Sequence, residues 1–193
     1  MQDDVYHPCQ ILADYLTIRE KFGETRGLKI GVAWTSAPNY VRPLSVPQSL
    51  ILMMPRFGLD VTLAVPPEFR LMPEIESQAA AHAAEAGVKF EISTRFEDAF
   101  EDADVVVPKS WGPLMHTTDH AEGLALIEKY PTWRCGQEHM NLGKDHLIYM
   151  HPLPADRGRE VTDEVIDGPQ SVVYDEAENR LHVQKALMAL TMG

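Results

Sequence analysis

The sequence predicts an α/β fold, in which helices cover both faces of a doubly wound parallel sheet of the Rossmann-like, three-layer type. Short apolar runs bounded by glycine and proline alternate with helical segments along almost the whole chain. Strands connected in this way are joined by right-handed crossovers and pair in parallel. With 193 residues, of which 45% are hydrophobic, the chain is long enough to bury a core as a single main domain.

The helices are predicted from end signals and apolar periodicity. The first runs from Pro8 to Phe22, because proline suits the first helical position and Gly23 favours the end. An alanine-rich helix runs from Pro73 to Ala86 and ends at Gly87. Further helical segments are expected at 49–57, 96–102, 121–130, 134–142, 162–167 and 176–192.

The strands are predicted as apolar runs between breakers, at 28–34, 60–65, 88–93, 104–107, 147–150 and 171–174. Between the first strand and the next helix, the segment from Thr35 to Pro47 carries three prolines, which predict an irregular loop. Loops of this length within a domain are usually functional.

Charge and cysteine content limit the function classes. The formal net charge is -12, from 17 basic and 29 acidic residues. Nucleic acids and anionic membranes attract basic surfaces, so we expect neither as a partner. Cys9 and Cys135 give no disulfide framework and no zinc spacing, and no apolar run reaches membrane-spanning length. We therefore expect a reduced, cytoplasmic protein.

The segment from Met150 to Arg157 is the strongest candidate site. It follows a buried strand, and parallel sheets place their ligands at the exits of such strands. Pro152 and Pro154 stiffen the backbone and remove two N–H donors. An X-Pro bond in a turn of this kind can be cis. The alternative is an ordinary proline-rich turn.

Several motifs together resemble the aspartate and ornithine carbamoyltransferases. They are His7-Pro8-Cys9-Gln10, His151-Pro152-Leu153-Pro154, and the tail Asp-Glu-Ala-Glu-Asn-Arg-Leu-His at 175–182. Lys109-Ser110-Trp111-Gly112 and the proline-rich loop resemble the knotted transcarbamylase branch, which includes N-acetylornithine-type enzymes. The resemblance covers nearly all of the chain, but only about the second half of a family member. It implies that the chain threads the proline-rich loop.

The resemblance implies a set of site residues. Carbamoyl phosphate would contact His7, Gln10, His151, Pro152, Leu153 and Arg180, of which His7, Gln10, His151 and Arg180 would be catalytic. Donors on the carbamoyl oxygen stabilise the developing oxyanion, and a His N–H and the Gln10 amide would serve. The Leu153 carbonyl would orient the carbamoyl amide. The acceptor would contact Lys109, Ser110, Trp111, Leu153 and Arg157. The family needs no metal or organic cofactor.

Three of these assignments have simpler alternatives. His7 would then be a solvated helix cap, Trp111 would pack in the core, and Arg180 would form a surface ion pair with Glu176 or Glu178. Glu160 falls where N-acetylornithine-type enzymes carry a lysine, and the Asp-x-Trp-x-Ser-Met-Gly pattern of ornithine enzymes is missing. Neither substrate is therefore assigned.

The chain lacks the Ser-Thr-Arg-Thr-type loop that supplies phosphate contacts in the family. We therefore expect an amino-acid-binding half: an inter-domain helix at 1–23, an amino-acid-binding domain at 24–174, and a helix at 175–193 that packs on a carbamoyl-phosphate domain. Expected partners are carbamoyl phosphate, an amino-acid or amine acceptor, and either a homotrimer or a separate N-terminal half. The alternative is a non-catalytic amino-acid-binding or regulatory module. A nucleotide-binding Rossmann domain is disfavoured, because no G-x-G-x-x-G follows the first strand.

Overall fold

A parallel sheet of five strands forms the centre of the computed structural model, which describes residues 3–38 and 42–192. The strand order is β3-β2-β1-β4-β5, and every pair is parallel, which confirms the predicted fold class. The strands are β1 (Lys29–Trp34), β2 (Asp60–Ala64), β3 (Phe90–Ser93), β4 (Val105–Lys109) and β5 (Ile148–Tyr149).

Helices cover both faces of this sheet. They are α1 (Pro8–Phe22), α2 (Ser45–Met53), α3 (Pro73–Ala86), α4 (His120–Ile127), α5 (Gln137–Met140), α6 (Asp163–Ile166) and α7 (Val173–Met192), with 3₁₀ turns η1 (Pro55–Phe57), η2 (Pro67–Phe69) and η3 (Glu97–Ala99). Both α1 and α3 have the predicted bounds. No helix in the described ranges is long and apolar enough to cross a membrane.

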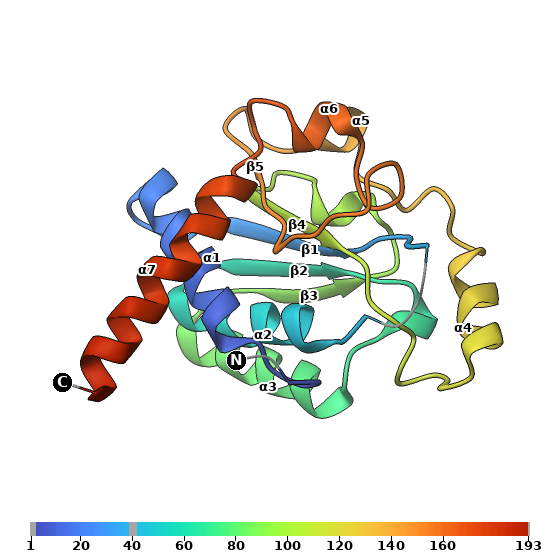
Figure 1. Ribbon diagram of the computed structural model, residues 1–193, viewed down its shortest axis with the longest axis horizontal. Helices are drawn as coiled ribbons and strands as arrows, with labels where there is room; N and C mark the ends of the chain where they lie inside the picture. The colour runs from blue at the N-terminus through green and yellow to red at the C-terminus, as the bar shows by residue number, and fades with distance from the viewer. Residues whose placement is uncertain (1–2, 39–41, 193) are drawn as a thin grey trace.

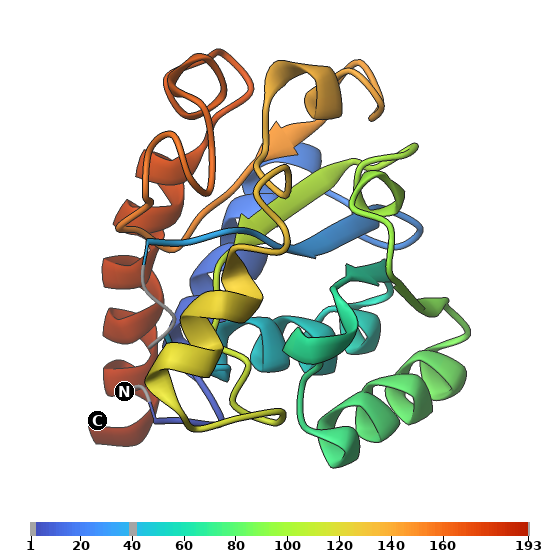
Figure 2. The same cartoon turned by 90° about the vertical axis from the view of Figure 1, so that its right-hand side faces the viewer.

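The first and last helices bring the two ends of the chain together. α1 packs along α7 on one side of the molecule, and the C-terminal turns of α7 extend beyond the body (Figure 1). Viewed from the side, α2 and α3 lie at one end of the structure and the segments around α5 and α6 at the other (Figure 2). Residues far apart in sequence therefore meet where α1, α7 and the loop after β5 adjoin.

The predicted strand at 171–174 is wrong. Ser171 makes only an isolated bridge to Tyr149, and α7 begins at Val173. Asp175 and Glu176 lie in the first helical turn, where carboxylates interact favourably with the helix dipole. The chain is therefore helical from Val173 onward.

Two helix predictions also need correction. The helix expected at 49–57 begins earlier, at Ser45, because Pro47 lies in its first turn, where a missing N–H is tolerated. It ends before Pro55, which opens the turn η1. The segment 96–102 contains a 3₁₀ turn instead of an acidic helix. Residues 39–41 of the proline-rich loop are outside the described ranges, and the predicted threading depends on them.

The strand order indicates where in the sheet a ligand site is expected. The sheet reverses its direction of growth between β1 and β4, a position where parallel sheets commonly bind ligands at the carboxyl ends of the strands. Trp34 pairs in register with Lys109 at this edge. The loop after β5 carries His151 and leaves the same edge of the sheet, because β5 is parallel to β4.

Gly31 in β1 allows the close approach of η3. A Cβ atom at this position would lie 1.8 Å from the backbone oxygen of Ala99. We predict that Gly31→Ala lowers the free energy of unfolding by about 2–3 kcal/mol, because the strand and the turn must move apart. Urea denaturation would measure this change in the free energy of unfolding. Glu91→Ala on the exposed side of β3 is the control, with a change within about 0.5 kcal/mol; equal effects would contradict the packing account.

Candidate active site

A cavity of about 740 Å³ lies between α1, the loop after β5 and α7. Its lining combines residues from all three elements, among them Gln10, His151, Leu153, Arg157 and Arg180. These residues span almost the full sequence, and the packing of α1 on α7 brings them together. Pro152 also lines this cavity, whereas His7 does not, although the Arg180 charge acts on its ring and lowers its pKa.

Gln10 is held at the cavity wall by two buried carboxylates. Its Nε2 donates to Asp14 Oδ1 at 2.8 Å and to Glu176 Oε1 at 2.9 Å. These bonds use both N–H groups of the amide, and Gln10 Oε1 has no partner among the described residues. Gln10 therefore presents a hydrogen-bond acceptor, in contrast to the donor expected from the sequence.

Asp14 and Glu176 are buried close together and share the Gln10 amide. Burial raises the pKa of Asp14 to about 7, and hydrogen bonds with Gln10 and Glu176 oppose part of that rise. Burial and the neighbouring Asp14 charge raise the pKa of Glu176 well above its ordinary value. The pair therefore retains a proton at neutral pH.

His151 fixes the loop and is itself fully buried. Its backbone N–H donates to Glu176 Oε2 at 2.8 Å, and its Nδ1 accepts from the backbone N–H of Leu153 at 3.0 Å. The proton of the neutral ring therefore resides on Nε2, which lies 3.4 Å from Glu160 Oε1. Burial lowers the pKa of His151 although Glu160 opposes it. The Leu153–Pro154 bond is cis, which an X-Pro bond in such a turn can be.

Glu160 is the carboxylate on the other side of this loop. Its Oε1 accepts from the backbone N–H and the hydroxyl of Ser110, at 2.7 and 2.6 Å. Its Oε2 accepts from the backbone N–H of Asp156 at 2.7 Å. Burial alone would raise the pKa of Glu160, but His151, Lys109 and these donors hold it well below its usual range. Glu160 is therefore ionised. No motif in the sequence predicted this structural role.

His7 and Arg180 retain free polar atoms near the cavity. His7 is 6% exposed and its Nδ1 has no partner, which does not fit a solvated cap. Burial and the Arg180 charge lower the pKa of His7. Arg180 is half-buried, its Nε has no partner, and no ion pair within the described chain holds it. The alternative ion pair with Glu176 is absent, because that carboxylate binds Gln10 and His151.

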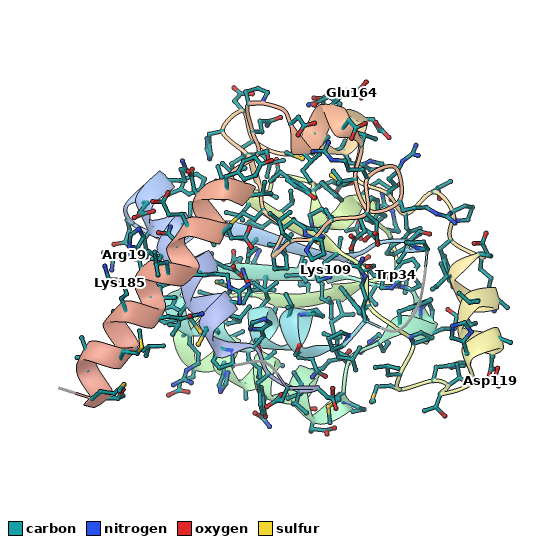
Figure 3. The ribbon with its side chains drawn as sticks, in the orientation of Figure 1. Arg19, Trp34, Lys109, Asp119, Glu164 and Lys185 are labelled. Carbon is teal, nitrogen blue, oxygen red and sulfur yellow. The ribbon has the colours of Figure 1, made fainter. Side chains whose placement is uncertain are left out.

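The predicted acceptor residues Lys109, Ser110 and Trp111 lie behind the loop and do not line the cavity. Trp111 is buried and its Nε1 donates to the Phe69 carbonyl at 2.7 Å, as in core packing. Figure 3 shows Lys109 beside Trp34 at one end of the sheet. Burial lowers the pKa of Lys109 to about 8, although the nearby Glu160 charge opposes this shift.

Arg157, also a predicted acceptor residue, lines the cavity but has internal partners. Its Nη1 lies 2.6 Å from both Asp163 Oδ1 and Asp167 Oδ2, and its Nη2 donates to Asp167 Oδ1 at 2.7 Å. These exposed ion pairs are individually weak.

Over residues 3–38 and 42–192, no three His, Cys, Asp or Glu side chains are grouped so that they could hold a metal ion.

Comparisons with known proteins identify the family of the chain. Residues 42–191 match the family model described as aspartate/ornithine carbamoyltransferase, Asp/Orn binding domain. The chain belongs to this family. The predicted resemblance is therefore confirmed.

Relatives in the family are similar over almost the whole chain. The putative carbamoyltransferase YgeW of Escherichia coli K12 is 38% identical over 97% of this chain and 54% of its own length. Ornithine carbamoyltransferase of Thermococcus kodakarensis is 40% identical over 98% of this chain and 57% of its own length. The crystal structure of acetylornithine transcarbamylase complexed with acetylcitrulline superposes with a TM-score of 0.91 at 37% sequence identity. The match covers 96% of this chain and 56% of that one. The chain thus spans little more than half the length of these relatives.

The buried acid pair predicts an unusual pH dependence of stability. Because the folded state raises the pKa of Asp14 from 3.8 to about 7, its contribution to the free energy of unfolding is present at acid pH and lost as pH rises through 7. Asp14→Asn mimics the protonated form and removes most of this fall, on the order of 2–4 kcal/mol.

Urea denaturation between pH 5 and 8 would measure the effect. Glu178→Gln, at an exposed position on the same helix as Glu176, is the control and should follow the wild-type curve. A wild-type and an Asp14→Asn protein with parallel curves would show that the pair does not titrate in this range.

Proposed function

We propose that this chain is the second-substrate half of a carbamoyltransferase. It would take part in transferring the carbamoyl group of carbamoyl phosphate to an amino-group acceptor, giving a ureido product and phosphate. The observation that carries the proposal is the convergence of Gln10, Leu153 and Arg180 on one cavity, where Gln10 Oε1 and Arg180 Nε have no hydrogen-bond partner in the described part of the chain.

The free atoms suit both ends of carbamoyl phosphate. Gln10 Oε1 and the Leu153 carbonyl would accept hydrogen bonds from the carbamoyl amide. Arg180 and His7 would donate to the carbamoyl or phosphate oxygens, which gain negative charge as the acceptor nitrogen attacks and the C–O bond to phosphate breaks. His151 and Pro152 would hold the Leu153 carbonyl in position, since His151 Nδ1 accepts from the Leu153 backbone N–H. His151 Nε2 lies 3.4 Å from Glu160 Oε1 and makes no hydrogen bond among the described residues.

The acceptor would lie on the side of Lys109, Ser110, Trp111 and Arg157, with the Leu153 backbone between the two substrates. The three segments 1–23, 24–174 and 175–193 would serve as inter-domain helix, amino-acid-binding domain and docking helix. α7 supports the last role, because it exposes large apolar side chains, namely Tyr174, Leu181, Met188, Leu190 and Met192.

Structures of relatives support the choice of substrates. N-acetyl-L-ornithine transcarbamylase has been solved as a mutant complexed with carbamyl phosphate and N-succinyl-L-norvaline, and this chain covers 56% of it at a TM-score of 0.90. A carbamoyl-phosphate domain contributed by a separate N-terminal half would complete the site, and the complete enzyme would be a homo-oligomer, a trimer as in the family. The second candidate is a non-catalytic amino-acid-binding module, favoured by the same partial coverage.

Single-turnover assays at high enzyme concentration separate the two candidates. Labelled carbamoyl phosphate would be mixed with ornithine, N-acetylornithine, N-succinylornithine, aspartate or putrescine, with and without an N-terminal half from a relative. We predict a ureido product, and a rate about 10²-fold lower in Arg180→Gln, because one donor to the developing charge is removed.

Lys185→Gln is the matched control. Lys185 lies on the same helix as Arg180 but far from Lys109 and the strand exits (Figure 3). It should retain the wild-type rate. Absence of product from every acceptor, under both conditions and with a folded chain, would contradict catalysis and leave a binding module.

A further inference from the structure

We propose that Asp14 and Glu176 are positioning residues of the cavity: they bind both N–H groups of the Gln10 amide, so that the cavity takes a primary amide at Gln10 and rejects a carboxylate there. This inference rests on the proposed function and deepens it, because it names the side chains that select the amide end of the ligand. Asp14 and Glu176 act through Gln10 and not by touching the ligand.

The Gln10 amide is held from two helices. Asp14 lies one turn after Gln10 on α1, where residues four apart share a face, and its Oδ1 accepts from Gln10 Nε2 at 2.8 Å. Glu176 comes from the first turn of α7, which packs along α1 (Figure 1), and its Oε1 accepts from the same nitrogen at 2.9 Å. Both carboxylates are 1% exposed, so water does not compete for these bonds.

The remaining carboxylate oxygens show where the proton of this acid pair resides. Glu176 Oε2 accepts from the backbone N–H of His151 at 2.8 Å, whereas Asp14 Oδ2 is buried and has no partner among the described residues. A proton on Asp14 Oδ2 leaves all three hydrogen bonds of the pair intact. The two oxygens that face the Gln10 amide therefore carry no proton.

These two oxygens determine which way the amide faces. An amide nitrogen has two hydrogens and satisfies both of them, whereas an amide oxygen in its place would face two acceptors and bind neither. Gln10 Oε1 is therefore directed away from Asp14 and Glu176, and it is buried without a partner in the described part of the chain. The orientation of the amide is thus imposed by the acid pair.

The consequence for a ligand lies at the cavity wall, which Gln10 and Leu153 both line. A bound primary amide supplies the hydrogens that Gln10 Oε1 lacks. A carboxylate supplies none, and it would leave this buried acceptor unpaired beside a negative charge, which is unfavourable. The cavity therefore distinguishes two groups of nearly the same shape by their hydrogen-bonding polarity.

A purely structural role of Asp14 predicts a different result for Asp14→Leu. The substitution keeps a buried side chain but removes the acceptor, so that one N–H of Gln10 is free to turn toward the cavity. If Asp14 only packs α1 against α7, amide and carboxylate ligands lose affinity by the same factor. If Asp14 positions Gln10, the ratio of the two affinities falls. Asp14→Asn keeps an acceptor oxygen and should retain the ratio.

The test compares phosphonoacetamide with phosphonoacetate, which differ in an amide against a carboxylate, by NMR titration of the full ¹⁵N-labelled chain. We expect the wild type to bind the amide about tenfold more tightly, which is the effect of about one hydrogen bond. Asp14→Asn should keep this ratio within about twofold, and Asp14→Leu should lower it by about fivefold or more.

Thr17→Val is the matched control. Thr17 accepts a hydrogen bond from Asn179 Nδ2 at 2.9 Å, so the substitution also removes a buried polar contact between α1 and α7. Thr17 does not line the cavity and does not contact Gln10 among the described hydrogen bonds. The variant should therefore keep the wild-type ratio of affinities.

Two results would overturn the inference: equal affinities of the wild type for the two phosphonates, or a folded Asp14→Leu variant with the wild-type ratio. A further measurement needs neither variant nor ligand. Both Gln10 Nε2 protons should exchange slowly with solvent in the wild type, and fast exchange of either would also overturn it. Slow exchange of both, without binding of either phosphonate, would contradict the proposed function while supporting the positioning of Gln10.

Discussion

Two buried glutamates hold the loop after β5 from opposite sides, and the geometry of the site depends on them. Glu176 binds the backbone N–H of His151 and the Gln10 amide, which ties the loop to α1 and α7. Glu160 binds the Asp156 backbone and Ser110, which ties the same loop to the end of β4. Buried carboxylates are tolerated when they are fully hydrogen-bonded or protonated, and each glutamate meets one of these conditions.

The parts of this arrangement that depend on local sequence could be predicted. Pro8 and Gly23 define α1, and alternating apolar runs define the parallel sheet, because end signals and periodicity act over a few residues. The motifs at His7, His151 and Arg180 identified the family. The strand expected at 171–174 failed because β-branched residues there are overruled by packing of α7 on α1.

What the sequence could not reveal are partners that lie far apart. Glu176 lies 166 residues from Gln10, and Glu160 lies 50 residues from Ser110. Neither pairing has a periodic or motif signal, so Glu176 entered only as an alternative surface ion-pair partner of Arg180, and Glu160 only as a departure from a family pattern. The orientation of the Gln10 amide follows from these partners and could not be predicted either.

The central claim is that Gln10, Leu153 and Arg180 together form half of a carbamoyl-phosphate site. The most direct test is a titration of the ¹⁵N-labelled chain with carbamoyl phosphate, observed at the Gln10 side-chain amide and the Arg180 Nε–H. We expect both signals to shift saturably with a common dissociation constant, while the exposed Lys185 is unaffected. Saturable binding that leaves Gln10 and Arg180 unchanged would contradict the account.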